Sequence, residues 1–504
     1  MLHSAASMVD DPTTPTVAAQ PHRPWLAALL SFAFPGLGHA YSGRWREAAL
    51  FGLPVVLLVV AGAALVTGLA GDRNSLLSRG FLTAVMVLNG LLLVWRLVAI
   101  AHAGLTPVRA VAGRHRRRAG AVVVGLIVAS IAMHAWVGIV AAHLEGTLTQ
   151  VFAGAPPEPV ANDPTPLPTG NAPRASDPPP TFRWDGKERI NVLLLGTDAA
   201  PGRSFALTDV LLLVSVDPVE GTAAMISVPR DTGFVPLPDA SVYPDGVFPE
   251  KINELSSRAA ENPEEWCPDL ADDPQACGLR SIRQAIGLYL GVEVHRHALV
   301  DMTGFAEMID AIGGVELCLP GRLVDPEFDG SLENRERDEP LVLPAGCHHY
   351  DGIDALAYAR SRKGWIEMPD GTREPQSDFT RSERQQQVLL ALRHELAQAD
   401  TLFELPGLLG AISRTVSTDL PRERAGDLVN LVPLITGPDI DQVVLGYPGY
   451  VDLPLQPDVN YLLIPRRDAI REEMARIFGA DELRGWWLAG EGAPPAQESN
   501  ELPR

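Results

Sequence analysis

The sequence predicts an α/β sandwich with a central mixed sheet, preceded by an α-helical transmembrane region. Three observations predict it: long apolar runs end before Leu148, a Pro-rich stretch follows, and short strand patterns then alternate with helical patterns. A chain of 504 residues, 46% of them hydrophobic, can hold several domains and a large core. Its net charge of −21 argues against nucleic acid as a partner, because binding phosphate backbones needs an extended basic face.

Three apolar runs are long enough to cross a membrane, since a helical span needs about 20 predominantly apolar residues. They cover residues 48–70, 81–102 and 119–143. An earlier stretch, "WLAALLSFAFPGLGHAYSG", is apolar but is broken by Pro35, Gly36 and Gly38, so it is either a fourth span or a re-entrant hairpin. The sequence therefore predicts a short N-terminal segment, 1–24, and a membrane anchor over residues 25–147.

Arginines crowd the segment that precedes the last span. They are Arg109, Arg114, Arg116, Arg117 and Arg118. Basic residues near span ends stay in the cytoplasm, so everything after His143 is expected outside the cell, on a multi-pass protein of the cell membrane. A solvated charged loop is the plainer interpretation of this run, and the two are compatible.

Residues 148–182 are rich in proline and are predicted to form an extended spacer. A folded domain over 183–487 and a disordered tail over 488–504 complete the predicted organisation. The four cysteines all lie in the folded domain, where an oxidising compartment permits disulfides. A metal site built from all four cysteines is the competing interpretation, but the sequence contains no C-x-x-C pair. Of three possible connectivities, the sequence-adjacent pairs Cys267 with Cys277 and Cys318 with Cys347 are favoured.

Within the folded domain, "RINVLLLGTDA", "DVLLLVSVDP" and "TAAMISVPRDT" are typical of buried strands. Helical patterns such as "GLRSIRQAIGLYLG" and "GFAEMIDAIGG" then alternate with the strand-like "HRHALVDM" and "VELCLP". This alternation indicates helices on both faces of a mixed sheet.

Charged residues stand at the ends of the predicted strands. Asp198 follows the first strand, Asp209 opens the second, and Arg230 and Asp231 end the third. Sheet ends are where α/β proteins build their sites. Each acid taken alone is equally typical of a turn or cap, and for Asp231 that interpretation is preferred.

Arginines also cluster in "YARSRKGWIEMPDGTREPQSDFTRSERQQ". If "YARSR" is a strand, Arg360 and Arg362 share one face. Arg381, Arg384 and Gln385 have i, i+3, i+4 spacing, so a helix that begins nearby presents them on one stripe. We expect Asp378 to cap that helix.

Guanidinium groups at a helix N-terminus indicate an anion site, and they suit phosphate oxygens in particular. Together with paired acids they are typical of a magnesium-pyrophosphate site, in which carboxylates hold Mg²⁺ and arginines neutralise the remaining charge. The alternative is an ordinary surface salt-bridge network with the acids of "WIEMPDGTREPQSD".

The ordered motifs resemble those of the LytR-CpsA-Psr family. The resemblance runs from about Ile190 to Leu396, through "NVLLLGTDA", "TDVLLLVSVDP", "ISVPRDT", "EKIN", "MIDAIGGVELCLP", "AGCHHYDGIDALAYARSR" and "DFTRSERQQ". It implies a membrane-anchored, extracytoplasmic phosphotransferase that moves a glycopolymer from a polyprenyl-pyrophosphate carrier onto peptidoglycan through a phosphodiester. A regulator or scaffold that binds the lipid without turnover, and a pyrophosphatase acting on it, remain alternatives.

The resemblance also assigns roles by motif position. Asp198 and Asp209 correspond to the acids that hold Mg²⁺, and the residues that correspond to pyrophosphate ligands are Arg230, Arg360, Arg362 and Arg381, with Gln385 beside them. Where the family commonly has Arg two residues before the second Asp, this chain has Leu207, so either Arg203 substitutes from the loop or the contact is missing. Arg384 is expected to assist substrate binding, and Asp231 or Asp209 is the candidate general base. Lys251 is expected to tie a loop to the sheet.

Overall fold

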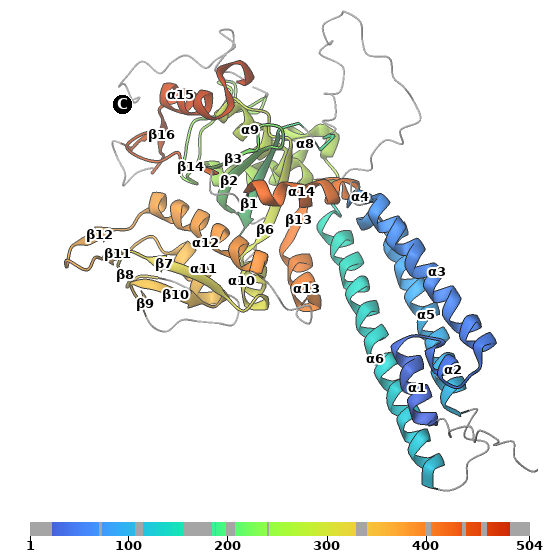
Figure 1. Ribbon diagram of the computed structural model, residues 1–504. Helices are drawn as coiled ribbons and strands as arrows, with labels where there is room; N and C mark the ends of the chain where they lie inside the picture. The colour runs from blue at the N-terminus through green and yellow to red at the C-terminus, as the bar shows by residue number, and fades with distance from the viewer. Residues whose placement is uncertain are drawn as a thin grey trace, which may run out of the picture. The chain divides into compact units, whose positions relative to one another are not determined.

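The computed structural model describes residues 23–69, 73–105, 114–154, 184–186, 188–197, 207–238, 241–328, 340–398, 405–435, 440–454 and 461–483. The chain divides into two compact units, which we describe separately (Figure 1). The first holds residues 1–71 and 83–139, and the second holds 72–82 and 140–504. Most of the predicted spacer and the whole predicted tail lie outside the described residues.

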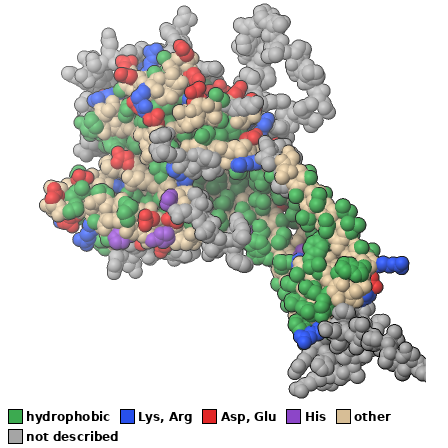
Figure 2. All heavy atoms as spheres, in the orientation of Figure 1, with side chains coloured by type: hydrophobic (Ala, Val, Ile, Leu, Met, Phe, Trp, Pro, Cys, Tyr) green, Lys and Arg blue, Asp and Glu red, His purple; other side chains and the backbone are tan. Residues whose placement is uncertain are grey.

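The three predicted apolar runs form three long helices. They are α3 (Trp45–Leu69), α5 (Arg79–Leu105) and α6 (Arg114–Val151). Within them, Trp45–Leu65, Arg79–Leu105 and Gly120–Val151 are long and apolar enough to cross a membrane. Aliphatic side chains on these helices are largely exposed, Val60 by 60% and Leu91 by 63%, and Figure 2 shows hydrophobic side chains over the outside of the helices. Such surfaces are typical of helices that lie in lipid. Helix α6 continues to Val151, beyond the predicted end of the anchor at residue 147.

The earlier apolar stretch forms two short helices, α1 (Pro24–Ala33) and α2 (Leu37–Tyr41). Helix α1 has 10 residues and is about 15 Å long, half of a bilayer core, so the stretch does not cross as one continuous helix. The turn between them contains Gly36 at φ 100°, a left-handed conformation that favours glycine. A Cβ there would lie 2.5 Å from the carbonyl oxygen of Ala48 in α3. The broken pattern therefore produces a hairpin packed against α3.

The second unit is built on a mixed six-stranded sheet with strand order β13-β6-β1-β2-β3-β14. The strands are β1 (Ile190–Thr197), β2 (Thr208–Asp217), β3 (Thr222–Ser227), β6 (Arg296–Asp301), β13 (Val416–Thr418) and β14 (Ile440–Val444). Strand β1 runs antiparallel to β2 and parallel to β6, and β14 runs parallel to β3. The predicted mixed sheet is confirmed.

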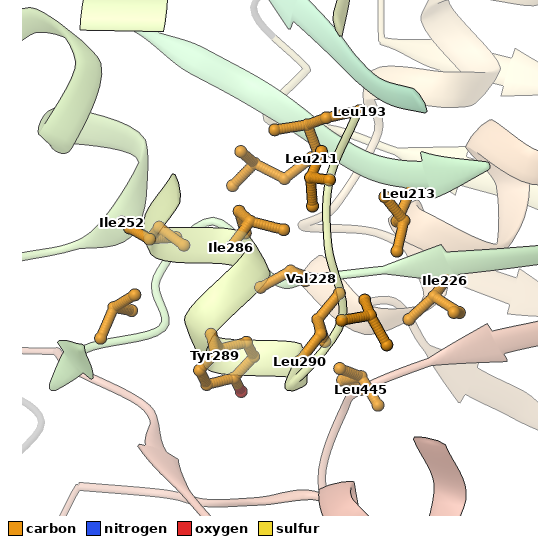
Figure 3. Packing of buried hydrophobic residues seen from close by; sticks show 14 of the residues in the cluster. Leu193, Leu211, Leu213, Ile226, Val228, Ile252, Ile286, Tyr289, Leu290 and Leu445 are labelled. Atoms are coloured by element: carbon orange, nitrogen blue, oxygen red, sulfur yellow. The ribbon is translucent and has the colours of Figure 1, made fainter. Parts of the chain in front are cut away.

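Both faces of this sheet are covered. On one face, Leu193, Leu213 and Ile226 pack with α7 (Ile252–Glu261), α9 (Pro274–Leu290) and α15 (Arg467–Phe478), as Figure 3 shows for part of this core. On the other face, Ile190 and Val216 pack with Leu431 of α14 (Ala425–Ile435). Successive strand residues point to opposite faces, so these apolar strands serve two cores. The predicted sandwich is confirmed.

Between β6 and β13 the chain forms a lobe with its own core. Its helices are α10 (Met302–Ala311), α11 (Gly352–Arg360), α12 (Asp378–Gln398) and α13 (Leu405–Thr415). Its strands are β7 (Val315–Leu319), β8 (Arg322–Asp325), β9 (Leu341–Leu343), β10 (Gly346–Tyr350), β11 (Trp365–Glu367) and β12 (Arg373–Pro375). Shorter elements elsewhere are α4 (Arg73–Leu77), α8 (Pro263–Trp266), β4 (Val235–Pro236), β5 (Val247–Phe248), β15 (Val451–Asp452) and β16 (Ile464–Pro465).

Both predicted disulfides are present, Cys267 with Cys277 and Cys318 with Cys347. Cys318 and Cys347 are cross-strand partners in the antiparallel pair β7 and β10. Strand β10 leads directly into α11, whose last residue is Arg360. This disulfide therefore fixes the segment that delivers the arginines.

Replacing Cys318 and Cys347 together by Ala is expected to lower the free energy of unfolding. The bridge closes a loop of 29 residues, which corresponds to about 3 to 4 kcal/mol through the unfolded state. Denaturant unfolding of the oxidised, detergent-solubilised protein measures this loss. An unchanged midpoint would contradict a stabilising role.

Candidate active site

A cavity of about 450 Å³ opens where the ends of β2 and β3 face the lobe and α12. Its lining comes from segments far apart in the sequence. The lining residues are Leu207, Asp209, Val210, Arg230, Met302, Asp325, Glu327, Phe328, Arg360, Arg362, Lys363, Arg381 and Gln385. Five of the described lining residues are cations and three are acids. Six residues that the sequence predicted for the site therefore meet in one cavity: Asp209, Arg230, Arg360, Arg362, Arg381 and Gln385.

Asp209 and Arg230 form an ion pair in the cavity wall. Asp209 lies at the start of β2 and Arg230 follows β3, the antiparallel neighbour of β2, so the sheet register brings them together. Arg230 Nη1 donates to Asp209 Oδ1 at 2.9 Å. Burial opposes the charge on Arg230, but Asp209 and then Asp378 raise its pKa above the usual arginine value. Arg230 therefore keeps its positive charge at neutral pH.

Asp378 is the shared counter-ion of three arginines. Its Oδ1 lies 3.0 Å from Arg381 Nη1, 3.6 Å from Arg230 Nε and 3.9 Å from Arg362 Nη1. Sequence reasoning expected Asp378 only as a helix cap. In the structure α12 begins at Asp378, and the hydroxyl of Ser377 accepts from the backbone N–H of Thr380, so Ser377 caps the helix. Asp378 instead holds the guanidinium groups together.

The predicted strand over "YARSR" is wrong. Helix α11 extends from Gly352 through Arg360, and Asp351 caps its N-terminus by accepting from the backbone N–H of Asp354 at 2.9 Å. Arg360 thus ends a helix, and Arg362 follows in the short connection to β11, which turns at Lys363 and Gly364. Both still line the cavity, although they come from a helix end and the segment after it rather than from the expected strand.

Asp325, which sequence reasoning missed, organises that turn. Its Oδ2 accepts from the hydroxyl of Ser361 at 2.8 Å and from the backbone N–H groups of Arg362 and Lys363, both at 3.2 Å. The side chain is buried, so these bonds stabilise its charge. In the sequence, "LVDPEF" has the composition of an ordinary turn and carries no sign of this role.

Arg381 and Arg384 of α12 are both buried but point to different places. Arg381 faces the cavity, and its pKa is lowered by burial and by Arg230, while Asp378 opposes the shift. Arg384 does not line the cavity: it donates to the carbonyl oxygens of Tyr358 and Ser361 and to Gln376. Burial lowers the pKa of Arg384 to about 10. Arg384 thus ties α12 to the end of α11.

Asp231 does not line the cavity, although it follows Arg230, which does. Its buried carboxylate accepts from Lys251 Nζ at 2.7 Å. The same loop is fixed to the sheet by the backbone, since Asn253 N–H donates to the carbonyl of Arg230 at 3.3 Å. The contacts of Lys251 and Asn253 are thus those of the expected loop tie.

Asp198 and Arg203 lie outside the described residues. Strand β1 ends at Thr197, whose partner in the ladder is Thr208, next to Asp209. Leu207 lines the cavity and presents an apolar side chain there.

The acids of the cavity are already engaged. Asp209 pairs with Arg230, Asp325 binds the turn, and Glu327 pairs with Lys363 at 3.1 Å. Three arginines share the single carboxylate of Asp378. The cavity is therefore electropositive in an acidic protein, and it fits a compact ligand with several negative charges.

The chain thus combines three helices that are long and apolar enough to cross a membrane with a sandwich domain whose cavity is lined by four arginines. The chain belongs to the LytR_cpsA_psr family: the sequence profile of that family matches residues 169–449, more than half of the chain.

Curated relatives share part of the sequence. Regulatory protein MsrR of Staphylococcus aureus (strain COL) is 31% identical over 239 residues, which cover 47% of this chain and 58% of MsrR. Polyisoprenyl-teichoic acid–peptidoglycan teichoic acid transferase TagV of Bacillus subtilis (strain 168) is 26% identical over 297 residues, covering 58% of this chain and 63% of TagV. The match thus spans less than two thirds of either relative.

Solved structures are similar over the same region. The crystal structure of B. subtilis TagV aligns with a TM-score of 0.41 at 23% identity, covering 58% of this chain and 98% of that one. A structure described as TagT bound to LI-WTA aligns with a TM-score of 0.38 at 20% identity, covering 60% and 94%.

Proposed function

We propose that this protein is a phosphotransferase that attaches a glycopolymer from a polyprenyl-pyrophosphate carrier to peptidoglycan through a phosphodiester. The observation that carries the proposal is the convergence of Arg230, Arg360, Arg362 and Arg381 around one cavity beside Asp209. Membership of the LytR_cpsA_psr family and the teichoic acid transferase name of the relative TagV support it.

The arginines bind the pyrophosphate of the donor. A guanidinium group matches phosphate oxygens with two parallel donors, and four such groups offset the charge that develops when the phosphate bond breaks. Arg381 is held by burial and Asp378, while Arg362, with 40% of its side chain exposed, is free to adjust to the ligand. Gln385 lines the same wall and offers neutral hydrogen bonds.

Asp209 fits a magnesium site. Mg²⁺ in phosphate sites is held by one or two carboxylates together with phosphate oxygens, and Asp209 brings one carboxylate to the cavity wall. The family resemblance assigns Asp198, the residue that follows β1 in the sequence, as the second. When bound, the ion supplies charge stabilisation to the phosphate oxygens.

In the proposed reaction an acceptor hydroxyl of peptidoglycan attacks the sugar-linked phosphorus. The new phosphorus–oxygen bond forms as the bond to the bridging oxygen breaks, and polyprenyl phosphate leaves with the electron pair. Arg230, Arg360, Arg362 and Arg381 stabilise both the transferred and the departing phosphate. Asp209 and Asp231 are the candidate proton acceptors. Because Asp231 is paired with Lys251, accepting a proton there would require that pair to open.

The same proposal places the folded domain outside the cell. The basic run before and at the start of α6 is retained in the cytoplasm, so α6 leads outward. Three helices long enough to cross a membrane, together with two disulfides, agree with an anchored protein in an oxidising compartment.

Two alternatives use the same cavity. Leu207, where the family commonly has Arg, removes one cation from the wall and favours a protein that binds the lipid as a regulator or scaffold without turnover. The name of MsrR, a regulatory protein, agrees with that class. A pyrophosphatase would need the same arginines but no acceptor.

Incubation with a lipid-linked donor and peptidoglycan fragments, followed by mass spectrometry, separates the three functions. The proposal predicts a glycan joined to the fragment through phosphate. Release of glycan phosphate into water without the joined product would indicate a pyrophosphatase. Binding of the donor without either product would indicate a regulator or scaffold.

Replacing Asp378 by Asn is expected to strengthen pyrophosphate binding about tenfold, because the carboxylate competes with the ligand for three arginines. The free protein should become less stable by about 2 kcal/mol, since the guanidinium groups lose their shared counter-ion. Calorimetry with inorganic pyrophosphate and denaturant unfolding measure the two effects. Weaker pyrophosphate binding in the variant would show that Asp378 supports the ligand rather than competing with it.

A further inference from the structure

Three side chains of residue types that bind metals meet in the first unit, whereas the arginine cavity lies in the second. They are His39 in α2, Glu47 in the first turn of α3 and His102 in the last turn of α5. One ligand atom from each lies within 4.8 Å of the others. We propose that these three residues form a binding site for a divalent transition-metal ion, with Zn²⁺ as the fitting case.

The distances are close to those of a coordination shell. His39 Nε2 lies 2.9 Å from His102 Nδ1, and His102 Nδ1 lies 3.8 Å from Glu47 Oε2. In a tetrahedral Zn²⁺ site with metal–nitrogen bonds of about 2.0 to 2.1 Å, ligand atoms stand about 3.3 Å apart. Small side-chain shifts are therefore enough to admit an ion among the three atoms.

His39 is built into the protein rather than left on its surface. The residue is fully buried, and its ring stacks on Phe51 with the centroids 4.7 Å apart. Phe51 is itself fixed, since Trp95 Nε1 donates to its carbonyl oxygen at 3.0 Å. Within the described part of the chain, Nδ1 of His39 has no hydrogen-bond partner. Burial of His39 therefore carries a free-energy cost that its one hydrogen bond to His102, through Nε2, does not offset.

The glycines of the hairpin bring the backbone close enough to hold His39 inward. A Cβ on Gly38 would lie 1.8 Å from the carbonyl oxygen of Ala27 in α1. Gly36 makes the similarly close approach to α3 described above. The Pro and Gly residues that break the apolar pattern therefore position His39. The proposed transferase function does not explain this arrangement.

Arg44 is the competing partner. It pairs with Glu47, so binding of an ion exchanges this ion pair for a metal bond. The side chain of Arg44 is 28% exposed, which allows it to move toward solvent. Two imidazoles and one carboxylate select a borderline ion such as Zn²⁺, whereas Mg²⁺ and Ca²⁺ prefer oxygen ligands alone.

A bound ion would join three segments that are distant in sequence, the hairpin, α3 and α5. In the orientation proposed above, this end of α5 leads into the basic cytoplasmic run, so the site takes its metal from the cytoplasm.

The test uses the full-length protein in detergent, purified without a histidine tag and freed of metal. Titration with Zn²⁺ against a chromophoric chelator should give one tight site per chain. His102→Gln and Glu47→Gln, at partly exposed positions, should each weaken Zn²⁺ binding at least about 100-fold. His143→Gln, an exposed histidine of α6 outside the cluster, is the matched control and should leave it unchanged.

Cobalt substitution gives a readout of the coordination itself. Co²⁺ in the wild-type site should show the visible absorption of a low-coordinate ion, and both ligand variants should lose it while remaining helical and monodisperse. Wild-type protein that binds no Zn²⁺, or variants that bind it as tightly as the wild type, would overturn the proposal.

Discussion

Replacing Arg362 by Ala is expected to reduce glycopolymer transfer at least about 1,000-fold, the loss typical of removing an arginine that stabilises transferring phosphate. Arg362 lines the cavity and is held only loosely by Asp378, at 3.9 Å. Its backbone position is fixed independently of its side chain, because Asp325 accepts from its N–H. The fold should therefore survive, with a melting temperature close to that of the wild type. Steady-state transfer and thermal unfolding, measured together, check both statements.

Arg322→Ala is the matched control for this variant. Arg322 is an exposed arginine of the same lobe that pairs with Glu367 at 3.6 Å and does not line the cavity. It should leave transfer unchanged. If Arg362→Ala loses thermal stability but keeps its activity, the arginine cluster is a salt-bridge network and not a substrate site.

Replacing Asp209 by Asn is expected to abolish magnesium-dependent turnover while weakening lipid binding much less. The carboxylate offers the metal a charged oxygen, whereas Asn offers only a neutral one, and the arginines that bind the lipid remain. Loss of the 2.9 Å bond to Arg230 should lower the free energy of unfolding by no more than about 2 kcal/mol, because Asp378 still lies 3.6 Å from Arg230. Activity measured against magnesium concentration, beside equilibrium lipid binding, separates the two effects.

Calorimetry tests whether magnesium and the lipid donor increase each other's affinity for the protein. Magnesium and a soluble polyprenyl-pyrophosphate analogue should each bind more tightly in the presence of the other, by the same factor. Glu327→Gln is the control, because Glu327 lines the same cavity but pairs with Lys363. Equal affinities with and without the second ligand would mean that Asp209 has a structural role only.

The sheet, its apolar strands and both disulfides could be predicted from the sequence, because period-two and helical patterns are local and cysteine spacing limits the pairings. The arginines of the cavity could be listed for the same reason: each lies at the end of a predicted element or in a short charged segment. The strand expected at "YARSR" failed because alternation over five residues is weak, while the Asp351 cap and the long apolar face of α11 favour a helix.

The organising acids could not be predicted. Asp378 and Asp325 act through contacts with residues brought together by the fold, and in sequence each has the composition of a cap or turn. The same limit applies to His39 and His102, which lie 63 residues apart and meet only when the hairpin packs onto α5. Contacts between residues that are distant in sequence depend on tertiary packing, and local sequence periodicity does not predict them.

The most direct test of the proposed transferase activity follows the phosphorus. A donor labelled at the sugar-linked phosphate is incubated with the full-length protein, magnesium and peptidoglycan fragments. We expect the label to enter the fragment in a phosphodiester, in equal amount to the polyprenyl phosphate released, and Arg362→Ala to stop both. Label that remains with the lipid in the presence of acceptor, or that leaves as free glycan phosphate, would contradict it.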